Sequence, residues 1–434
     1  MLVKTIPSRK KRTIYSMYLR KYRALVFILL IIMIITIMFP FEYYRSIATY
    51  FYPKINTIFS KDISFNINDN RYINVTKRFY NPFEIIIRYF KGVVIQRDAF
   101  YVDISMINYQ KLNYRAYLAR RRGVIHDSDK DVIVKAKLSY KNREYETKIN
   151  LKGRFMDHLE GKRLSFRIKL LNDNEYILGM NRFSIHNPAT RNFMNEWLYH
   201  RMLTHLGLIA LYYDFVDLYI NGEYIGIYAV EEFPNLNVAE KNQRRDGLIF
   251  SNPHSNSDGL KVYQRNKVNK KPFLSKTLNL FNSVYTQYKN GNIKNESYFD
   301  YDKLAKYAAI TELFGGAHGN LKGNFINYFN PLTSKTEVIG YDSNSGDLLS
   351  KVALQIEPRA SYFYKSSKFS KIYQDKYFFK RYLYYIMKFS QPDYFDVFFK
   401  GIKSDYNNNS LFLAKERPWH NPEPDYFFKN QKYV

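Results

Sequence analysis

Two basic side chains on one predicted strand are the residues with the clearest chemical potential in this sequence. Within residues 150–170, the apolar side chains of Phe166, Ile168 and Leu170 alternate with Ser165, Arg167 and Lys169. A two-residue period puts alternate side chains on opposite faces of a strand. One face can therefore enter a core while Arg167 and Lys169 emerge together on the other, where two cations suit a polyanionic ligand.

The start of the chain predicts a membrane anchor. Residues 24–41 are apolar except for Thr36 and Pro40, and as a helix they would span about 27 Å, close to a hydrocarbon core of roughly 30 Å. Eight Lys or Arg residues and no acid precede this segment, whereas the next fifteen residues contain only Arg45 and Lys54 as basic residues. The positive-inside rule predicts a single-pass protein of the cytoplasmic membrane, with its N-terminus inside and its body periplasmic or extracellular. The alternative is a cleaved signal peptide, for which Ser-Ile-Ala at 46–48 offers a weak site.

Composition excludes several kinds of site and predicts an anionic partner. The 434-residue chain has no cysteine, which excludes disulfides, thiolate zinc sites and thiol nucleophiles. Its formal net charge is +28, and +8 of this lies in residues 1–23, which leaves +20 on the body. Such an excess predicts an anionic ligand or substrate. Nucleic acid is not expected, because the body is predicted to lie outside and the 42 tyrosines and 34 phenylalanines form no recognisable RNA- or DNA-binding motif.

The first half of the body predicts a sheet followed by a helix and a hairpin. Alternation predicts strands at 132–138, 145–151 and 164–171, joined as a meander. Apolar residues at helical spacing then predict a helix over 193–206, which Gly207 ends. Strands at 215–220 and 224–230 flank Asn221-Gly222, and Asn-Gly accepts positive φ at both turn positions, so a tight hairpin is expected.

The second half places polar side chains beside glycines. Helical spacing predicts a helix over 304–314 that stops at Gly315-Gly316, after which the chain continues Ala-His-Gly-Asn-Leu-Lys-Gly-Asn to Asn324. Strands at 325–329 and 336–339 then lead to Asp342. A loop asparagine, a hairpin and then an aspartate is the order in which protein kinases hold magnesium between phosphates.

These segments resemble the spore coat protein H (CotH) kinase family. In that family a Lys-Gly-Arg or Arg-Gly-Asn turn precedes a strand ending in aromatic-x-Ile/Leu-Lys-Leu, as residues 152–154 and 166–170 do here. A helix ending in Leu-Gly-Leu, an Asn-Gly-x-Tyr-x-Gly-x-Tyr hairpin and a glutamate also recur, at 206–208, 221–228 and Glu231. The resemblance covers roughly residues 130–345 and implies an α+β, atypical protein-kinase-like body with two lobes.

The resemblance implies phosphate-binding roles for several residues. Lys169 would contact the phosphates of Mg-ATP, and Glu196 on the following helix would support it. No Gly-x-Gly-x-x-Gly loop is present, so Lys152 and Arg154 would cover the phosphates instead. Glu231 would lie where the chain passes the adenine.

The resemblance also implies a metal site with an altered base. Asn324 and Asp342 would be the Mg²⁺ ligands. Where a kinase has its catalytic aspartate this chain has Asn320, and an asparagine does not accept a proton as a carboxylate does. His318 would be the substitute base, since its ordinary pKa lies near neutrality.

Two functions follow from these patterns. The first is a membrane-anchored phosphotransferase that uses Mg-ATP to phosphorylate a protein or a cell-envelope acceptor, and retention of Asn324 and Asp342 favours it. The alternative is a catalytically inactive kinase-like protein that binds an anionic envelope polymer or scaffolds envelope assembly, and Asn320 favours that. The sequence does not indicate an oligomeric state.

The expected organisation has five parts. They are a basic cytoplasmic tail at 1–23, a transmembrane helix at 24–41, a stalk or N-terminal part of the body at 42–129, the kinase-like domain at 130–345, and a helical, aromatic-rich C-terminal part of the same body at 346–434.

Overall fold

The computed structural model describes residues 82–251, 260–320, 324–349, 372–420 and 424–434. The chain divides into two units, Met1–Ile86 and Ile87–Val434, and the boundary falls inside helix α4 (Pro82–Val94). The transmembrane helix predicted at 24–41 lies outside the described residues. Within them, no helix combines the length and the apolar character that a membrane span requires.

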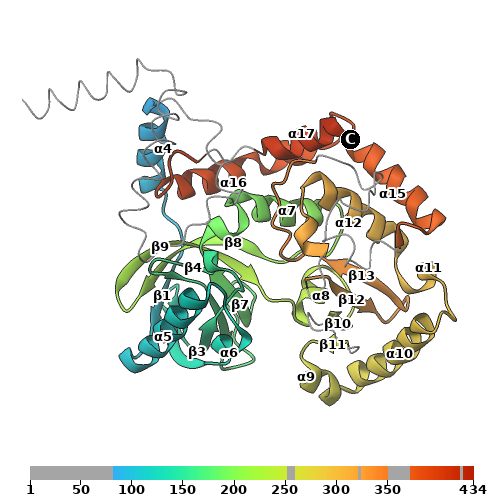
Figure 1. Cartoon of the computed structure of the whole chain (residues 1–434), viewed down its shortest axis with the longest axis horizontal. Coiled ribbons are helices and arrows are strands. Elements are labelled where there is room, and N and C mark those ends of the chain that lie inside the picture. The colour runs from blue at the N-terminus through green and yellow to red at the C-terminus, as the bar shows by residue number, and fades with distance from the viewer. Residues whose placement is uncertain (1–81, 252–259, 321–323, 350–371, 421–423) are drawn as a thin grey trace, which may run out of the picture. The chain divides into compact units, whose positions relative to one another are not determined.

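A closed β-barrel organises the first half of the second unit (Figure 1). Around the described barrel the strands follow the order β1 (Ala99–Asp103), β2 (Val134–Tyr140), β3 (Arg143–Leu151), β6 (Phe166–Leu170), β7 (Arg182–His186), β9 (Glu223–Glu232) and β8 (Tyr213–Ile220). Parallel pairing of β1 with β8 closes the ring, and the other pairs are antiparallel. The meander expected from the alternating segments is confirmed by the pairing of β2 with β3 and of β3 with β6.

Strand alternation fills the barrel interior with apolar side chains. Phe166, Ile168 and Leu170 are buried in a core shared with the other barrel strands, while Lys169 between them is exposed. The tight turn between β8 and β9 has φ of 51° at Asn221 and 80° at Gly222, so the predicted Asn-Gly hairpin is also confirmed. Helix α5 (Met106–Arg122) packs near β2 and β3, and the short helix α6 (Asp127–Lys130) packs near β3. The loop between β3 and β6 contains η1 (Met156–His158) and the small hairpin of β4 (Leu159–Glu160) and β5 (Arg163–Leu164).

A second sheet and its helices follow the barrel. Its strands are ordered β11 (Lys261–Val262), β10 (Leu248–Ser251), β12 (Ile326–Asn330) and β13 (Lys335–Ile339). Around it lie α8 (Asn237–Lys241), α9 (Arg265–Lys270), α10 (Pro272–Lys289) and α11 (Asn295–Tyr298). The predicted strands at 325–329 and 336–339 correspond to β12 and β13, which pair as an antiparallel hairpin.

A helical region with an aromatic core completes the described chain. It contains η2 (Pro188–Arg191), α7 (Met194–His205), α12 (Tyr301–Leu313), η3 (Ala317–Asn320), α15 (Lys376–Phe389), α16 (Asp396–Ala414) and α17 (Asp425–Tyr433). Trp197 of α7, Tyr307 of α12 and Phe378 of α15 are buried in one cluster. The mixed α+β class expected from the sequence is confirmed.

Candidate active site

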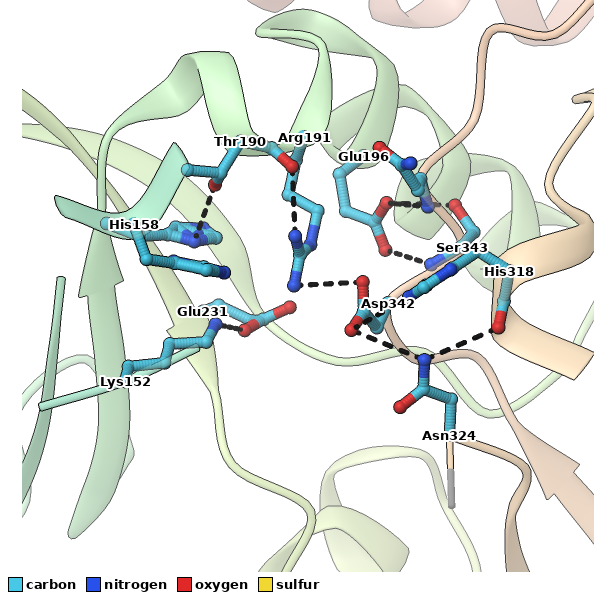
Figure 2. A network of polar contacts seen from close by, with 12 residues as sticks. Lys152, His158, Thr190, Arg191, Glu196, Glu231, His318, Asn324, Asp342 and Ser343 are labelled. Atoms are coloured by element: carbon cyan, nitrogen blue, oxygen red, sulfur yellow. Dashed lines mark hydrogen bonds and ion pairs between the residues drawn. The ribbon is translucent and has the colours of Figure 1, made fainter. Parts of the chain in front are cut away.

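A buried ion pair connects the end of β3 with the end of β9. Lys152 is the residue after β3 and Glu231 is the penultimate residue of β9, and their side chains are only 3% and 1% exposed. Lys152 Nζ donates to Glu231 Oε2 (Figure 2). Burial lowers the pKa of the Lys152 ammonium, and Glu231 opposes this shift. The second carboxylate oxygen, Oε1, is buried without a hydrogen-bond partner among the described residues, so it can accept one more donor.

The short helix η2 places an arginine beside this pair. The Asn187 side chain accepts from Ala189 N–H at 3.2 Å and Pro188 begins the turn, whose fixed φ suits a first helical position. The chain then reverses through Asn192 and Phe193, which have φ of 51° and 56°. This reversal leaves the side chain of Arg191, the last residue of η2, buried and directed toward Asp342, as Figure 2 shows.

Arg191 is paired with Asp342. Its Nη2 lies 2.8 Å from Asp342 Oδ1. Burial alone would lower the pKa of Arg191, but the carboxylates of Asp342 and Glu231 outweigh it and raise that pKa. Burial alone would raise the pKa of Asp342, but Arg191 and the neighbouring His318 hold it well below the usual range. Both partners are therefore charged at neutral pH.

Asp342 also meets residues of the loop after α12. Its Oδ2 accepts from Asn324 Nδ2 at 3.4 Å and lies 3.7 Å from His318 Nε2, and Asn324 Nδ2 also reaches the His318 carbonyl at 3.4 Å. Asn320 lies on the same short helix, η3, as His318, and its buried Oδ1 has no hydrogen-bond partner among the described residues. Asp342 has φ of 50°, a conformation that a non-glycine residue adopts at a cost and that often marks a functional site.

Glu196 of α7 holds the loop that follows Asp342. Its carboxylate accepts from Ser343 N–H at 3.0 Å, from Ser343 Oγ at 2.8 Å and from Asn344 N–H at 3.2 Å. Burial, reinforced by the negative charges of Asp342 and Glu231 and opposed by Arg191, raises the pKa of Glu196 to about 7. Glu196 therefore fixes the backbone that presents Asp342.

A comparison with models of protein families shows the family of this chain. A family model described as CotH kinase protein matches residues 149–389, more than half of the chain. The chain belongs to the CotH kinase family. The resemblance inferred from the sequence motifs is confirmed, and the matched region of this CotH chain contains Lys152, Arg191, Glu231, Asn324 and Asp342. No curated protein matches the chain.

The expected pairing of Lys169 with Glu196 is absent from this CotH chain. Lys169 is half-exposed on the outer face of β6, where its Nζ lies 3.8 Å from Asp173 Oδ1. Glu196 instead binds the loop after Asp342 and lies 3.6 Å from the ring of His200, whose pKa burial lowers to about 3. The alternation that identified Lys169 as an outward residue was right. The same alternation places the Lys169 side chain on the outside of the barrel, away from the buried network.

The other predicted residues divide into those inside the network and those outside it. Lys152, Glu231, His318, Asn324 and Asp342 lie within it, as Figure 2 shows. Arg154 is exposed, and its carbonyl accepts from Ile125 N–H at 2.9 Å. The lysine–glutamate pair of the site is thus Lys152 with Glu231, whereas Glu231 was expected beside the adenine.

Sequence reasoning missed Arg191 and a pair of histidines. His158 and His186 stack with ring centroids 6.2 Å apart, and their hydroxyl partners are Ser165 for His158 and Thr190 for His186. Burial and the nearby cations lower the pKa of both histidines well below the usual value, so they are neutral. One sequence signal near Arg191 was available. Asn187 followed by Pro188 is typical of the start of a helical turn, and Arg191 is the last residue of that turn.

The donors around Asp342 fit Mg²⁺ in kind. Mg²⁺ prefers oxygen ligands, is often held by one or two carboxylates, and keeps several waters or phosphate oxygens. The ionised carboxylate of Asp342 is such a ligand, and the amide oxygen of Asn324 would become one if the side chain turned, because its Nδ2 now faces Asp342. The described residues contain no group of three or more His, Cys, Asp or Glu that could hold a metal ion, so the protein would supply only part of the ligand set. Arg191 already contacts Oδ1, so a cation bound at this oxygen would compete with Arg191.

Proposed function

We propose that this CotH family chain is a membrane-anchored phosphotransferase that uses Mg-ATP to phosphorylate a protein or a cell-envelope acceptor. The observation that carries the proposal is the buried network of Lys152, Glu231, Arg191 and Asp342, with Asn324 at its edge. Charged groups that are shielded from water and held in place are the main requirement of phosphoryl transfer, which depends on positioning and charge neutralisation. In this proposal the barrel and the helical region are the two lobes of a kinase-like body.

Each member of the network has a role in the proposed reaction. Lys152, oriented by Glu231, binds phosphate oxygens of the nucleotide. Asp342 and Asn324 hold Mg²⁺, which when bound neutralises charge on the phosphates. Glu196 keeps the Asp342 loop in place through its contacts with Ser343 and Asn344.

His318 is the proposed base in this site. Its side chain is partly exposed and lies 3.7 Å from Asp342, so an acceptor hydroxyl can approach it from solvent. Asn320, on the same turn of η3, offers a hydrogen-bond acceptor through its unpartnered Oδ1 and orients the hydroxyl. Loss of a formal carboxylate base does not abolish a reaction that depends mainly on electrostatics.

The second candidate function is an inactive kinase-like protein that binds an anionic envelope polymer or scaffolds envelope assembly. The specific observation in its favour is the Arg191–Asp342 ion pair, which already neutralises the carboxylate that would hold the metal. In that case the network is a structural remnant, and the excess of basic residues carries the function.

Transfer of labelled phosphate separates the two functions. The full chain is incubated with Mg²⁺ and ATP labelled at the γ-phosphate, with dephosphorylated casein as the acceptor probe, and label in casein and in the chain itself is measured. We expect incorporation by the wild type and a loss of at least about a hundredfold in Asp342→Asn, as removal of key charge stabilisation causes in other enzymes. Lys148→Met, which removes an exposed cation of β3, is the matched control and should behave as the wild type. No incorporation by folded wild type would favour the inactive protein, and equal incorporation by Asp342→Asn would show that the transfer does not depend on this site.

A further inference from the structure

Two arginines share the outer face of neighbouring barrel strands. In the antiparallel pair of β6 and β7, Arg167 lies opposite Ser184 and Lys169 lies opposite Arg182. Arg167 and Arg182 are therefore diagonal neighbours on one face, within reach of long side chains. The opposite face of these strands is filled by core residues such as Phe166 and Ile168, so both arginines are turned away from the core.

A third cation and two aromatic rings complete this cluster. The guanidinium carbon of Arg182 lies 3.8 Å from the ring centre of Phe233, which follows β9. The rings of Phe233 and Tyr263 are 5.7 Å apart, and Lys261 Nζ lies 5.4 Å from the centre of the Tyr263 ring. Stacking of this kind fixes the plane of a guanidinium and leaves its N–H edge available to a ligand.

Within the part of the chain that the structure describes, the cluster has no ion-pair partner, although the negative charge of Asp127 acts on Lys261 from beyond ion-pair distance. Among the described residues no carboxylate forms an ion pair with Arg167, Arg182 or Lys261, and Arg167 Nε is buried without a hydrogen-bond partner. Nearby Lys169 and Lys267, by contrast, both reach Asp173, at 3.8 and 3.1 Å.

Burial and neighbouring positive charges disfavour the charged forms of two of these side chains. Burial, added to the charge of Arg167, lowers the pKa of both Arg182 and Lys261, and at Lys261 the carboxylate of Asp127 opposes this shift without outweighing it. Partly buried like charges without an ion-pair partner repel each other, so an anion bound among them would relieve both the repulsion and the unmet hydrogen bonding.

We propose that Arg167, Arg182 and Lys261 form a binding site for a phosphate group. Arginine offers a planar fork of donors that matches phosphate oxygens, and lysine adds a point charge. The site requires no phosphoryl transfer, so it stands whether or not the chain is a kinase. The phosphate belongs either to the nucleotide donor or to an anionic acceptor polymer, and the two sources can be separated by experiment.

Binding of inorganic tripolyphosphate to the full chain tests the site. We expect the wild type to bind it, and both Arg182→Met and Arg167→Gln to weaken the binding about tenfold or more, as loss of a hydrogen bond between charged groups does. Lys148→Met, which lies opposite Lys169 on the neighbouring strand β3, removes the same charge and should change the affinity less than about twofold if the effect is specific. No binding by the wild type, or an equal loss in all three variants, would overturn the proposal.

Melting without ligand controls for folding. Removing one of three repelling cations should leave the melting temperature of Arg182→Met unchanged or raise it, whereas a structural arginine would lower it. If Arg182→Met does unfold, Arg182→Lys keeps the charge but not the fork and should still weaken tripolyphosphate binding. Unchanged binding in Arg182→Lys and in Arg167→Gln would then refute the site.

Competition identifies the source of the phosphate. If saturating ATP displaces tripolyphosphate from the wild type, the site binds the donor, and if both bind together, it binds an acceptor. If the site binds an acceptor, the variant Asp342→Asn should bind tripolyphosphate as tightly as the wild type. Failure of the proposed transfer reaction is therefore distinguishable from failure of this site.

Discussion

Lys152 and Glu231 are the side chains whose separate removal should cost the most stability. Each variant, Lys152→Met or Glu231→Gln, leaves a buried charged group without its partner, which costs about 3–5 kcal/mol in such pairs. The double variant removes both charges and should recover part of this loss. Denaturant unfolding of the four proteins measures the coupling, and losses that add within about 0.5 kcal/mol would show that the two groups do not interact.

Glu196 should give the protein a pH-dependent stability. Its pKa is raised from 4.5 to about 7 by burial, so between these values the folded chain holds a proton that the unfolded chain has released. The stabilising contribution is complete below pH 4.5 and is lost as the pH rises through 7, by up to about 3 kcal/mol. We expect the melting temperature of the wild type to fall relative to Glu196→Gln between pH 5 and pH 8. Parallel curves for the two proteins would contradict the raised pKa.

Sequence patterns identified most of the residues that meet in the buried network, but not the contacts between them. Motif order led to Asn324 and Asp342, which do meet, because a loop and a hairpin bring them together over a short stretch of chain. Alternation identified Lys169 as outward-facing but does not tell the outside of a barrel from a cleft. Arg191 lies in one turn of helix, η2, which has no periodicity to read, and its partner is 151 residues further along the chain.

Among the secondary-structure elements, the barrel is supported by the segment that directly follows α16, outside the CotH-matched region. Glu416 Oε1 accepts from Ile227 N–H at 2.7 Å, and its Oε2 accepts from Arg163 at 2.7 Å. Lys415 Nζ lies 3.0 Å from both carboxylate oxygens of Asp217. Residues after 389 thus hold β8 and β9, whose second strand carries Glu231 into the site.

Removal of this support should destabilise the barrel. Glu416→Ala leaves the Ile227 N–H unpaired, and Ile227 is almost fully buried, so a loss of about 1–3 kcal/mol is expected. The matched control is Glu223→Ala, which breaks an exposed pair with Lys162 and should change stability by less than about 1 kcal/mol. Thermal unfolding and hydrogen exchange at the Ile227 amide measure the effect. Equal losses in both variants would show that the segment after α16 does not support the barrel.

Local signals predicted elements better than their assembly. The Asn221-Gly222 hairpin and the strands 325–329 and 336–339 were predicted because turn residues and alternation act within a few positions. Closure of the barrel was not predicted, since β1 pairs in parallel with β8, more than a hundred residues later in the chain. Nothing in either segment alone encodes that pairing.

For the chain as a whole, the membrane topology is a separate prediction. The basic residues before the segment 24–41 predict an outward-facing body, a compartment that contains little ATP. A reporter that is active only after export, fused behind Val434, should therefore be active. Activity of a cytoplasmic reporter at the same position would contradict the outward orientation and would place the candidate site where ATP is abundant.

The central claim is that the network around Lys152 and Asp342 binds a magnesium nucleotide. The most direct measurement is the melting temperature of the full chain with and without millimolar ATP and Mg²⁺, for the wild type, Asp342→Asn and Lys148→Met. Ligand at a hundred times its dissociation constant stabilises by about 2.7 kcal/mol, which raises the melting temperature by several degrees. We expect a magnesium-dependent rise in the wild type and in Lys148→Met and none in Asp342→Asn. The absence of a rise in folded wild type, or an equal rise in Asp342→Asn, would contradict the claim.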